Sequence, residues 1–180
     1  MGANSQRPSE TFQVYREGDR KLTEGWFRFP DSYNGSGGGW QMKQAATGSN
    51  SSHYAEPPVL RLEMVESRWV LRHSVDRNPI TLWQSEPNPR QEWLHMALDV
   101  TYSQDPSEGR IVVYEGSDAK PLSKVAEITG YATLLTEENT GAATPQGGAM
   151  PSHLRAGIYQ RLAYGDNTMD LGPTRVYGIR

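Results

Sequence analysis

Two arginines flank a tyrosine in the segment His153-Leu-Arg-Ala-Gly-Ile-Tyr-Gln-Arg161, near the C-terminal end of the chain. With the two-residue period of a β-strand, Arg155, Tyr159 and Arg161 share one face. Gly157 lies between them and leaves open space on that face. A guanidinium pairs with a carboxylate through two parallel hydrogen bonds, and it also stabilises a nearby phenolate. The pattern indicates either a surface that recognises an acidic polymer or a sugar, or an ordinary solvated strand face.

A second polar strand is predicted to begin at Trp40. Trp40, Met42 and Gln44 share one side of this strand, whereas Gln41 and Lys43 share the other. Glutamine is uncommon inside a strand unless its amide has a hydrogen-bond partner. The segment is therefore either part of a binding site or an edge strand with solvated side chains.

Further arginines alternate with apolar residues in the two segments that follow. Arg61 lies between Leu60 and Leu62, and Arg68 and Arg72 flank a short apolar stretch. Each of these arginines either lines a groove or lies on the outer surface of a sheet.

These residues must be positioned by β-strands, because short alternating segments separated by turn residues recur along the whole chain. One short helix is predicted, over Thr129–Glu137. We expect an all-β fold, an antiparallel two-sheet β-sandwich of the jelly-roll type, because an open sheet would leave one apolar face uncovered. The predicted strands are Thr11–Tyr15, Gly25–Phe29, Trp40–Gln44, Val59–Val65, Arg68–His73, Trp93–Tyr102, Ile111–Glu115, Leu154–Tyr164 and Thr174–Ile179.

Composition excludes several classes of function. The chain has 180 residues, fits one domain over residues 1–180, and carries no cysteine, so disulfide scaffolds, thiol nucleophiles and cysteine-ligated zinc are excluded. A net charge of −3 argues against binding to nucleic acid or to an anionic membrane surface. No apolar run approaches the ~20 residues that a membrane-spanning helix needs. The first residues, Met1–Arg7, contain no hydrophobic stretch, so we expect no signal peptide in the sequence as written.

The segment His153–Arg161 resembles the Lys-x-Gly-x-Tyr strand of concanavalin A-like jelly-roll polysaccharide lyases. The resemblance is strongest to the heparin-lyase-I-like group and more distant to the alginate and glucuronan lyases. Compared with that group the chain is short before its first matching segment, as expected of an N-terminally truncated copy. Four other segments match the group in the same order: Glu17–Pro30, Trp40–Gln44, Glu92–Tyr114 and Thr174–Ile179.

This resemblance implies that the protein cleaves a polysaccharide containing uronic acid by β-elimination. The reaction needs a group that neutralises the C5 carboxylate, a base that removes the C5 proton, and an acid that protonates the departing O4. It requires no metal ion or organic cofactor. The implied partner is an acidic polysaccharide, with no role for nucleic acid or membrane, and we expect a secreted, extracellular monomer.

The resemblance also assigns roles to individual residues. Tyr159 falls on the catalytic tyrosine of the family, Gln44 on its carboxylate-neutralising glutamine, and Arg155 on a position usually occupied by lysine. The family often has histidine or lysine where this chain has Ala46, which leaves the base open among Lys43, His53, His73 and His95. We expect Tyr159, Gln44, Arg155 and His95 to be catalytic. The expected substrate-binding residues are Arg161, Lys43, Trp40 and Arg61.

Three alternatives remain open at this point. A lectin-like module on the same fold would bind a glycan without cleaving it. A glycoside hydrolase needs two carboxylates on one face. The pattern Glu-x-Asp, which would place them so, occurs only at Glu17-Gly-Asp19, within a predicted turn. A purely structural jelly roll is the third. Separately, Asp166, Asn167 and Asp170 could hold a structural calcium ion, although such a cluster is more typical of a polar turn.

Overall fold

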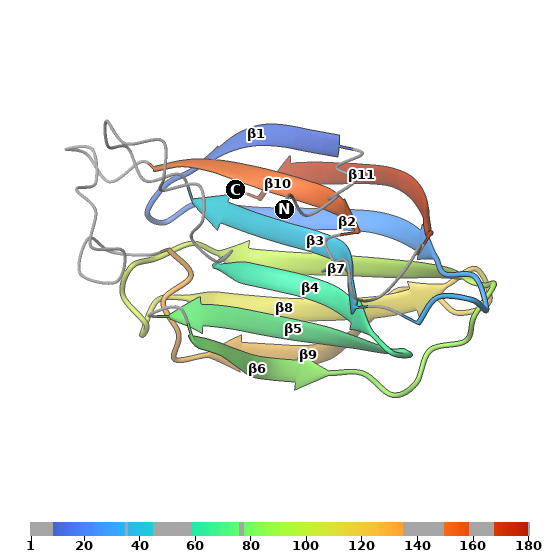
Figure 1. Cartoon of the computed structure of the whole chain (residues 1–180). Coiled ribbons are helices and arrows are strands. Elements are labelled where there is room, and N and C mark those ends of the chain that lie inside the picture. The colour runs from blue at the N-terminus through green and yellow to red at the C-terminus, as the bar shows by residue number, and fades with distance from the viewer. Residues whose placement is uncertain are drawn as a thin grey trace.

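Two antiparallel β-sheets pack face to face in the computed structural model of the chain (Figure 1). The structure describes residues 9–34, 36–44, 59–75, 78–134, 150–158 and 168–179. None of these residues forms a helix that is long and apolar enough to cross a lipid bilayer. The strands are β1 (Ser9–Tyr15), β2 (Arg20–Arg28), β3 (Ser36–Gln44), β4 (Leu60–Val65), β5 (Arg68–Val75), β6 (Asn78–Gln84), β7 (Trp93–Thr101), β8 (Arg110–Ser117), β9 (Ser123–Thr129), β10 (Met150–Ile158) and β11 (Asp170–Gly178).

The strand order interleaves distant parts of the chain. One sheet has six strands in the order β1-β10-β3-β4-β5-β6, and the other has five in the order β11-β2-β7-β8-β9. Strand β10 therefore lies between β1 and β3, next to the first third of the sequence. This crossover brings the arginine-bearing segment of β10 beside the glutamine-bearing segment of β3.

Alternating side chains of both sheets form one core between them. In β7 the even-numbered residues from Leu94 to Val100 are buried against the other sheet. Phe27 of β2 packs edge-on against Trp40 of β3 and Trp69 of β5, with ring centroids 5.1 Å apart in both pairs. Because large aromatic and aliphatic side chains fill the space between the sheets, the functional side chains must lie on the outer faces or at the ends of the sandwich.

A glycine lets β3 approach β4 closely. Gly39 has φ +151°, and a Cβ atom at this position would lie 2.2 Å from the carbonyl oxygen of Leu62. No other residue type fits there without moving the backbone. Gly39 thereby fixes the register of the two central strands of the six-stranded sheet.

The predicted antiparallel two-sheet sandwich is confirmed, but two strands were missed and one helix was predicted wrongly. The missed strands are β6 and β9, both at sheet edges, and β9 is mostly exposed and has no clear apolar face. The helix over Thr129–Glu137 was wrong, since Thr129 ends β9 and residues 130–134 form bends. In that segment Thr133 bonds to Ser103, with its backbone N–H donating to the Ser103 carbonyl oxygen at 2.8 Å.

Candidate active site

Four polar residues lie in one row across the outer face of the six-stranded sheet. Arg155 of β10 is opposite Gln41 of β3, Gln41 is opposite Arg61 of β4, and Arg61 is opposite Arg72 of β5. Their sequence neighbours, such as Leu154 and Met42, point into the core. With neighbouring strands ~4.8 Å apart, the row is about 14 Å long. We call these four residues the polar row.

Two glycines lie next to the polar row on the same face. Gly157 of β10 is opposite Gly39 of β3, and Gly39 is opposite Glu63 of β4. Neither glycine carries a side chain, so no side chain projects from these two positions beside Arg155 and Gln41. Gly39 is buried and Gly157 is partly buried. We call this pair of glycines the glycine floor.

A carboxylate is held between two guanidinium groups at the other end of the polar row. The Nε atom of Arg61 is 3.3 Å from Oε2 of Glu63, and the Nε atom of Arg72 is 3.1 Å from Oε1. The Glu63 side chain is 7% exposed, and burial raises its pKa although both arginines act to lower it. Neither Nε–H makes a hydrogen bond of good geometry. Both guanidinium groups are therefore partly unsatisfied by the protein.

Positive charge exceeds negative charge in this part of the face. Arg61, Arg72 and Arg155 contribute three guanidinium groups, whereas the carboxylates are Glu63 on β4 and Glu10 on β1, which is opposite Arg155. Gln41 lies among them and is 5% exposed, so its amide is shielded from bulk water. Guanidinium and amide donors on a partly dehydrated surface bind a carboxylate better than the same groups in water. The arrangement can hold a carboxylate over the glycine floor.

Two of the predicted site residues are brought together by the structure. Arg155 and Arg61 lie in the polar row, separated only by Gln41. Lys43 occupies the register position two residues along β3 from Gln41, opposite His153 of β10. Tyr159 and Arg161, and also His53, lie outside the described residues. Tyr159 follows Gly157 by two positions in the sequence.

The glutamine on the same face as Arg155 is Gln41, not the predicted Gln44. Gln44 pairs with Ser152 and occupies a register position on the Trp40 side of β3, whereas Arg155 pairs with Gln41. Because successive residues of a strand face opposite sides, Gln44 and Arg155 belong to opposite faces of the sheet. Gln41 is the glutamine on the arginine-bearing face.

Trp40 is a core residue rather than a sugar-binding platform. Its side chain is 2% exposed, and its indole Nε1–H donates to the Thr174 hydroxyl at 3.4 Å. The ring also fills the space over Gly25, where a Cβ atom would lie 2.8 Å from it. A tryptophan can satisfy its single polar atom inside the core and then offers no face to a ligand.

The two histidines in the described residues that were considered as bases lie away from the polar row. His95 is on β7, in the other sheet, where it stacks on Trp26 with ring centroids 4.2 Å apart. Burial lowers its pKa, partly opposed by Glu24 at 3.8 Å. His73 is 1% exposed, and its Nε2 atom is 2.5 Å from the carbonyl oxygen of Ala132. The sandwich core separates His95 from Arg155, so the predicted catalytic set does not assemble around His95.

The polar row contains residues that sequence reasoning did not select. Alternation alone places Gln41 on the face of Lys43, and Arg72 and Glu63 opposite their apolar neighbours. The missing information was strand order, because Gln41, Arg61 and Arg72 become neighbours only when β3, β4 and β5 are adjacent. No local pattern in the sequence specifies that adjacency.

The predicted calcium ligands do not form a site within the described residues. Asp166 and Asn167 lie outside that part of the chain, and Asp170 of β11 accepts a hydrogen bond from Arg28 Nε at 2.7 Å. Across the described residues, no three histidine or acidic side chains are grouped as metal ligands would be.

Comparison with solved structures identifies proteins of the same fold. An endo-β-1,4-glucuronan lyase from the fungus Trichoderma reesei is 13% identical, covers 93% of this chain and 74% of its own, and has a TM-score of 0.66. An alginate lyase of family PL-14 from Aplysia kurodai is 12% identical, with coverages of 92% and 72% and a TM-score of 0.56. A glycoside hydrolase family 43 protein from Bacillus licheniformis is 12% identical, with coverages of 89% and 28% and a TM-score of 0.52.

These identities are low, so the likeness shows the fold and not the chemistry. No protein-family model matches the chain, and neither does any curated protein sequence. The structural neighbours include jelly-roll polysaccharide lyases, which agrees with the coarser part of the resemblance seen in the sequence. The finer resemblance, to the heparin-lyase-I-like group, stays a prediction.

Proposed function

We propose that the protein is a polysaccharide lyase that cleaves a uronic-acid-containing polysaccharide by β-elimination. The observation that carries this proposal is the polar row beside the glycine floor, on the outer face of the six-stranded sheet. The fold shared with glucuronan and alginate lyases supports it. We also propose that the protein acts outside the cell as a monomer, because its substrate would be an extracellular polymer.

In this proposal the polar row stabilises the negative charge that develops on the substrate. Arg155 and Gln41 bind the carboxylate at C5, which makes the C5 proton more acidic and stabilises the enolate-like intermediate. A base takes that proton, the electron pair forms the C4–C5 double bond, and the C4–O4 bond breaks. An acid then protonates the departing O4 oxygen, so that protons and electrons balance.

The acid and the base are assigned to residues near the glycine floor. We propose Tyr159 as the acid, because it follows Gly157 on the arginine-bearing face of its predicted strand. Lys43 is the proposed base if Tyr159 does not serve both roles, because its register position is next to Gln41 on β3. Arg61 and Arg72 would bind the carboxylates of neighbouring sugar units, and Arg161 is proposed as a further substrate-binding residue.

The spacing of acidic residues in the six-stranded sheet does not favour a glycoside hydrolase with two catalytic carboxylates. In the six-stranded sheet the only acidic residues are Glu10 on β1 and Glu63 on β4. These strands are three positions apart, which is about 14 Å at ~4.8 Å per strand. A pair of hydrolytic carboxyl groups is separated by ~5–9.5 Å.

The experiment that tests the proposal is incubation with glucuronan, polymannuronate, polyguluronate and a neutral glucan. A lyase product contains an unsaturated uronate that absorbs in the near ultraviolet, so activity is read as absorbance. We expect product from at least one polyuronate and none from the neutral glucan, and we expect Tyr159→Phe to abolish it. Gln41→Ala should reduce the rate at least ~100-fold, the effect of losing one preorganised donor to a developing anion.

Gln44→Ala is the matched control, since it makes the same truncation on the same strand. It should keep most of the activity. Binding to a polyuronate without product, at protein concentrations that would detect slow turnover, would instead support the lectin-like alternative. Equal losses in the Gln41 and Gln44 variants would contradict the role given to the polar row.

A further inference from the structure

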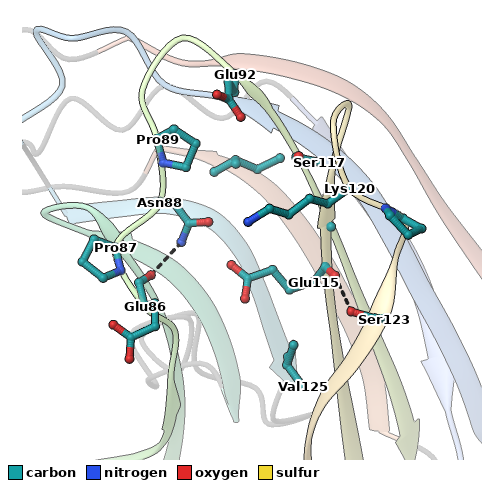
Figure 2. Close-up of a pocket in the computed structure, with 13 residues that line it drawn as sticks. Glu86, Pro87, Asn88, Pro89, Glu92, Glu115, Ser117, Lys120, Ser123 and Val125 are labelled. Atoms are coloured by element: carbon teal, nitrogen blue, oxygen red, sulfur yellow. Dashed lines mark hydrogen bonds between the residues drawn. The ribbon is translucent and has the colours of Figure 1, made fainter.

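A separate cavity of about 280 Å³ opens at the edge of the sandwich, away from the polar row. It lies between the loop that follows β6 and the β8–β9 hairpin, as Figure 2 shows. The residues that enclose it are Glu86, Pro87, Asn88, Pro89, Glu92, Leu94, Glu115, Gly116, Ser117, Lys120, Pro121, Ser123 and Val125. Its volume is just below the range for ligand pockets, which is ~300–1,000 Å³, and suits a molecule of about one sugar ring.

A half-buried carboxylate lies inside this cavity. In Figure 2 the carboxylate of Glu115 points into the space between Lys120 and Asn88. Burial raises the pKa of Glu115, and hydrogen bonding to Asn88 and the charge of Lys120 only partly oppose this. Among the described residues, Asn88 and Lys120 thus offset the Glu115 charge only in part.

The surroundings of Glu115 favour a positively charged guest. Glu86 and Glu92 at the rim add negative charge, although Glu86 is ion-paired with Arg68 Nη1 at 3.6 Å, and Lys120 on the hairpin turn adds one positive charge and is exposed. Low-dielectric walls strengthen the resulting negative potential inside a cleft. Pro87, Leu94 and other apolar residues offer contact to a carbon skeleton. A uronate would be repelled by the same potential.

A bare metal ion fits less well than an organic cation. Calcium and magnesium need several oxygen ligands directed at one point. The described residues contain no group of three acidic or histidine side chains placed as metal ligands. A protonated amine needs only one or two carboxylate or carbonyl acceptors, and its carbon skeleton can pack against the prolines.

We propose that this cavity binds a small organic cation, a primary amine on a body of about the size of one sugar ring, through an ion pair between the ammonium group and Glu115. The ammonium group of Lys120, whose charge acts on Glu115, competes with the amine, and its exposed side chain can move aside when the amine enters. The site is independent of the polar row and does not rest on the lyase proposal.

Titration of the full chain with glucosamine at pH 7, followed by two-dimensional amide NMR, tests this proposal. We expect saturable shifts at Asn88, Gly116 and Ser117. N-acetylglucosamine has the same ring without the charge, and it should bind at least ~10-fold more weakly. Absence of saturable shifts at these residues, or equal binding of the two sugars, would overturn the proposal.

Three single-residue variants test whether the Glu115 carboxylate binds glucosamine. Glu115→Gln keeps the side-chain shape and should weaken glucosamine binding at least ~10-fold, whereas Glu108→Gln makes the same charge change on an exposed turn and should leave it unchanged. Lys120→Met removes the competing ammonium group and should strengthen binding, which gives a second measurement if Glu115→Gln does not fold. Unchanged affinity in both Glu115→Gln and Lys120→Met would also overturn the proposal. Lyase activity is read separately on a polyuronate, so the two proposals can fail independently.

Discussion

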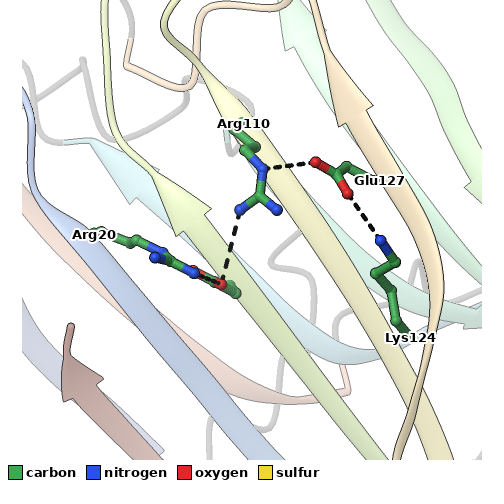
Figure 3. Close-up of polar contacts among 5 residues, drawn as sticks. Arg20, Arg110, Lys124 and Glu127 are labelled. Carbon is green, nitrogen blue, oxygen red and sulfur yellow. Dashed lines mark hydrogen bonds and ion pairs between the residues drawn. The ribbon is translucent and has the colours of Figure 1, made fainter.

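The outer faces of the two sheets both carry arginines and carboxylates, but the geometry of their ion pairs differs. On the five-stranded sheet Arg20 donates two hydrogen bonds to Asp99, at 2.9 and 2.6 Å. Arg110 and Lys124 donate to Glu127 at 2.8 and 3.0 Å, as Figure 3 shows. Each carboxylate in this group, which we call the closed network, has a hydrogen-bonded cation on a neighbouring strand.

The polar row differs from the closed network in its balance of positive and negative charges and in the geometry of its ion pairs. Three guanidinium groups and two carboxylates, Glu63 and Glu10, lie there, and the contacts of Arg61 and Arg72 with Glu63 lack hydrogen-bond geometry. Two residues without side chains, Gly39 and Gly157, lie next to the polar row. The comparison teaches that the presence of arginines on a strand face does not indicate a binding site. What distinguishes the polar row is that the Nε–H groups of Arg61 and Arg72 have no hydrogen-bond partner among the described residues.

The largest expected difference between the two faces is in catalysis. Arg61→Ala should lower the rate on a polyuronate at least ~100-fold, because it removes a cation that binds substrate carboxylate. Arg110→Ala removes the same group from the closed network and should leave the rate within about three-fold of the parent protein. Steady-state rates measured by ultraviolet absorbance, with circular dichroism to verify folding, decide this. Similar losses in both variants would show that the two faces do not differ in function.

The second difference is expected in stability. Asp99 is 3% exposed and accepts both hydrogen bonds from Arg20, so Asp99→Asn should reduce the free energy of unfolding. We expect a loss of about 1–2 kcal/mol, since hydrogen bonds to charged groups contribute ~1.5–3 kcal/mol and the Arg20 side chain, at 43% exposure, is screened by water. Urea unfolding measures this loss. Lyase activity should be unchanged, and a fall in activity without a fall in stability would reverse the assignment of the closed network.

Strand alternation predicted much of the fold because burial acts on each strand separately. The core face of Trp93–Thr101 and the outward position of Arg155 both follow from a two-residue period. The same rule cannot tell which sheet a strand joins. His95 was placed correctly on the face opposite Leu94, but that face belongs to the five-stranded sheet.

The candidate site was harder to predict than the fold because it depends on pairings between distant strands. Gln41 becomes the partner of Arg155 only through the antiparallel register of β3 with β10, more than a hundred residues later in the chain. Sequence reasoning preferred Gln44, three positions away, which belongs to the opposite face. Trp40 was expected to contact sugar, but its single polar atom finds a partner in Thr174 and the ring stays in the core.

The smallest expected difference concerns proton binding by one carboxylate from each face. The pKa of Glu127 is lowered to about 2, first by its hydrogen bond from Arg110 and then by that from Lys124. Its depressed folded value means that this residue supports folding above its ordinary pKa of 4.5, and the support is lost as pH falls from there toward about 2. Burial instead raises the pKa of Glu63, so Glu63 takes up a proton before an ordinary glutamate does and opposes folding above its raised value.

Carbon-13 NMR of the glutamate side-chain carboxyls measures both values in one titration. We expect Glu63 to titrate above 4.5 and Glu127 near 2, with Glu127→Gln reducing the loss of stability between pH 4.5 and 2. Adding a saturating polyuronate oligomer should move the Glu63 midpoint and leave that of Glu127 unchanged. The reason is that only the polar row shares its guanidinium groups with a bound carboxylate. A ligand-induced shift at Glu127, or none at Glu63, would place the binding face on the other sheet.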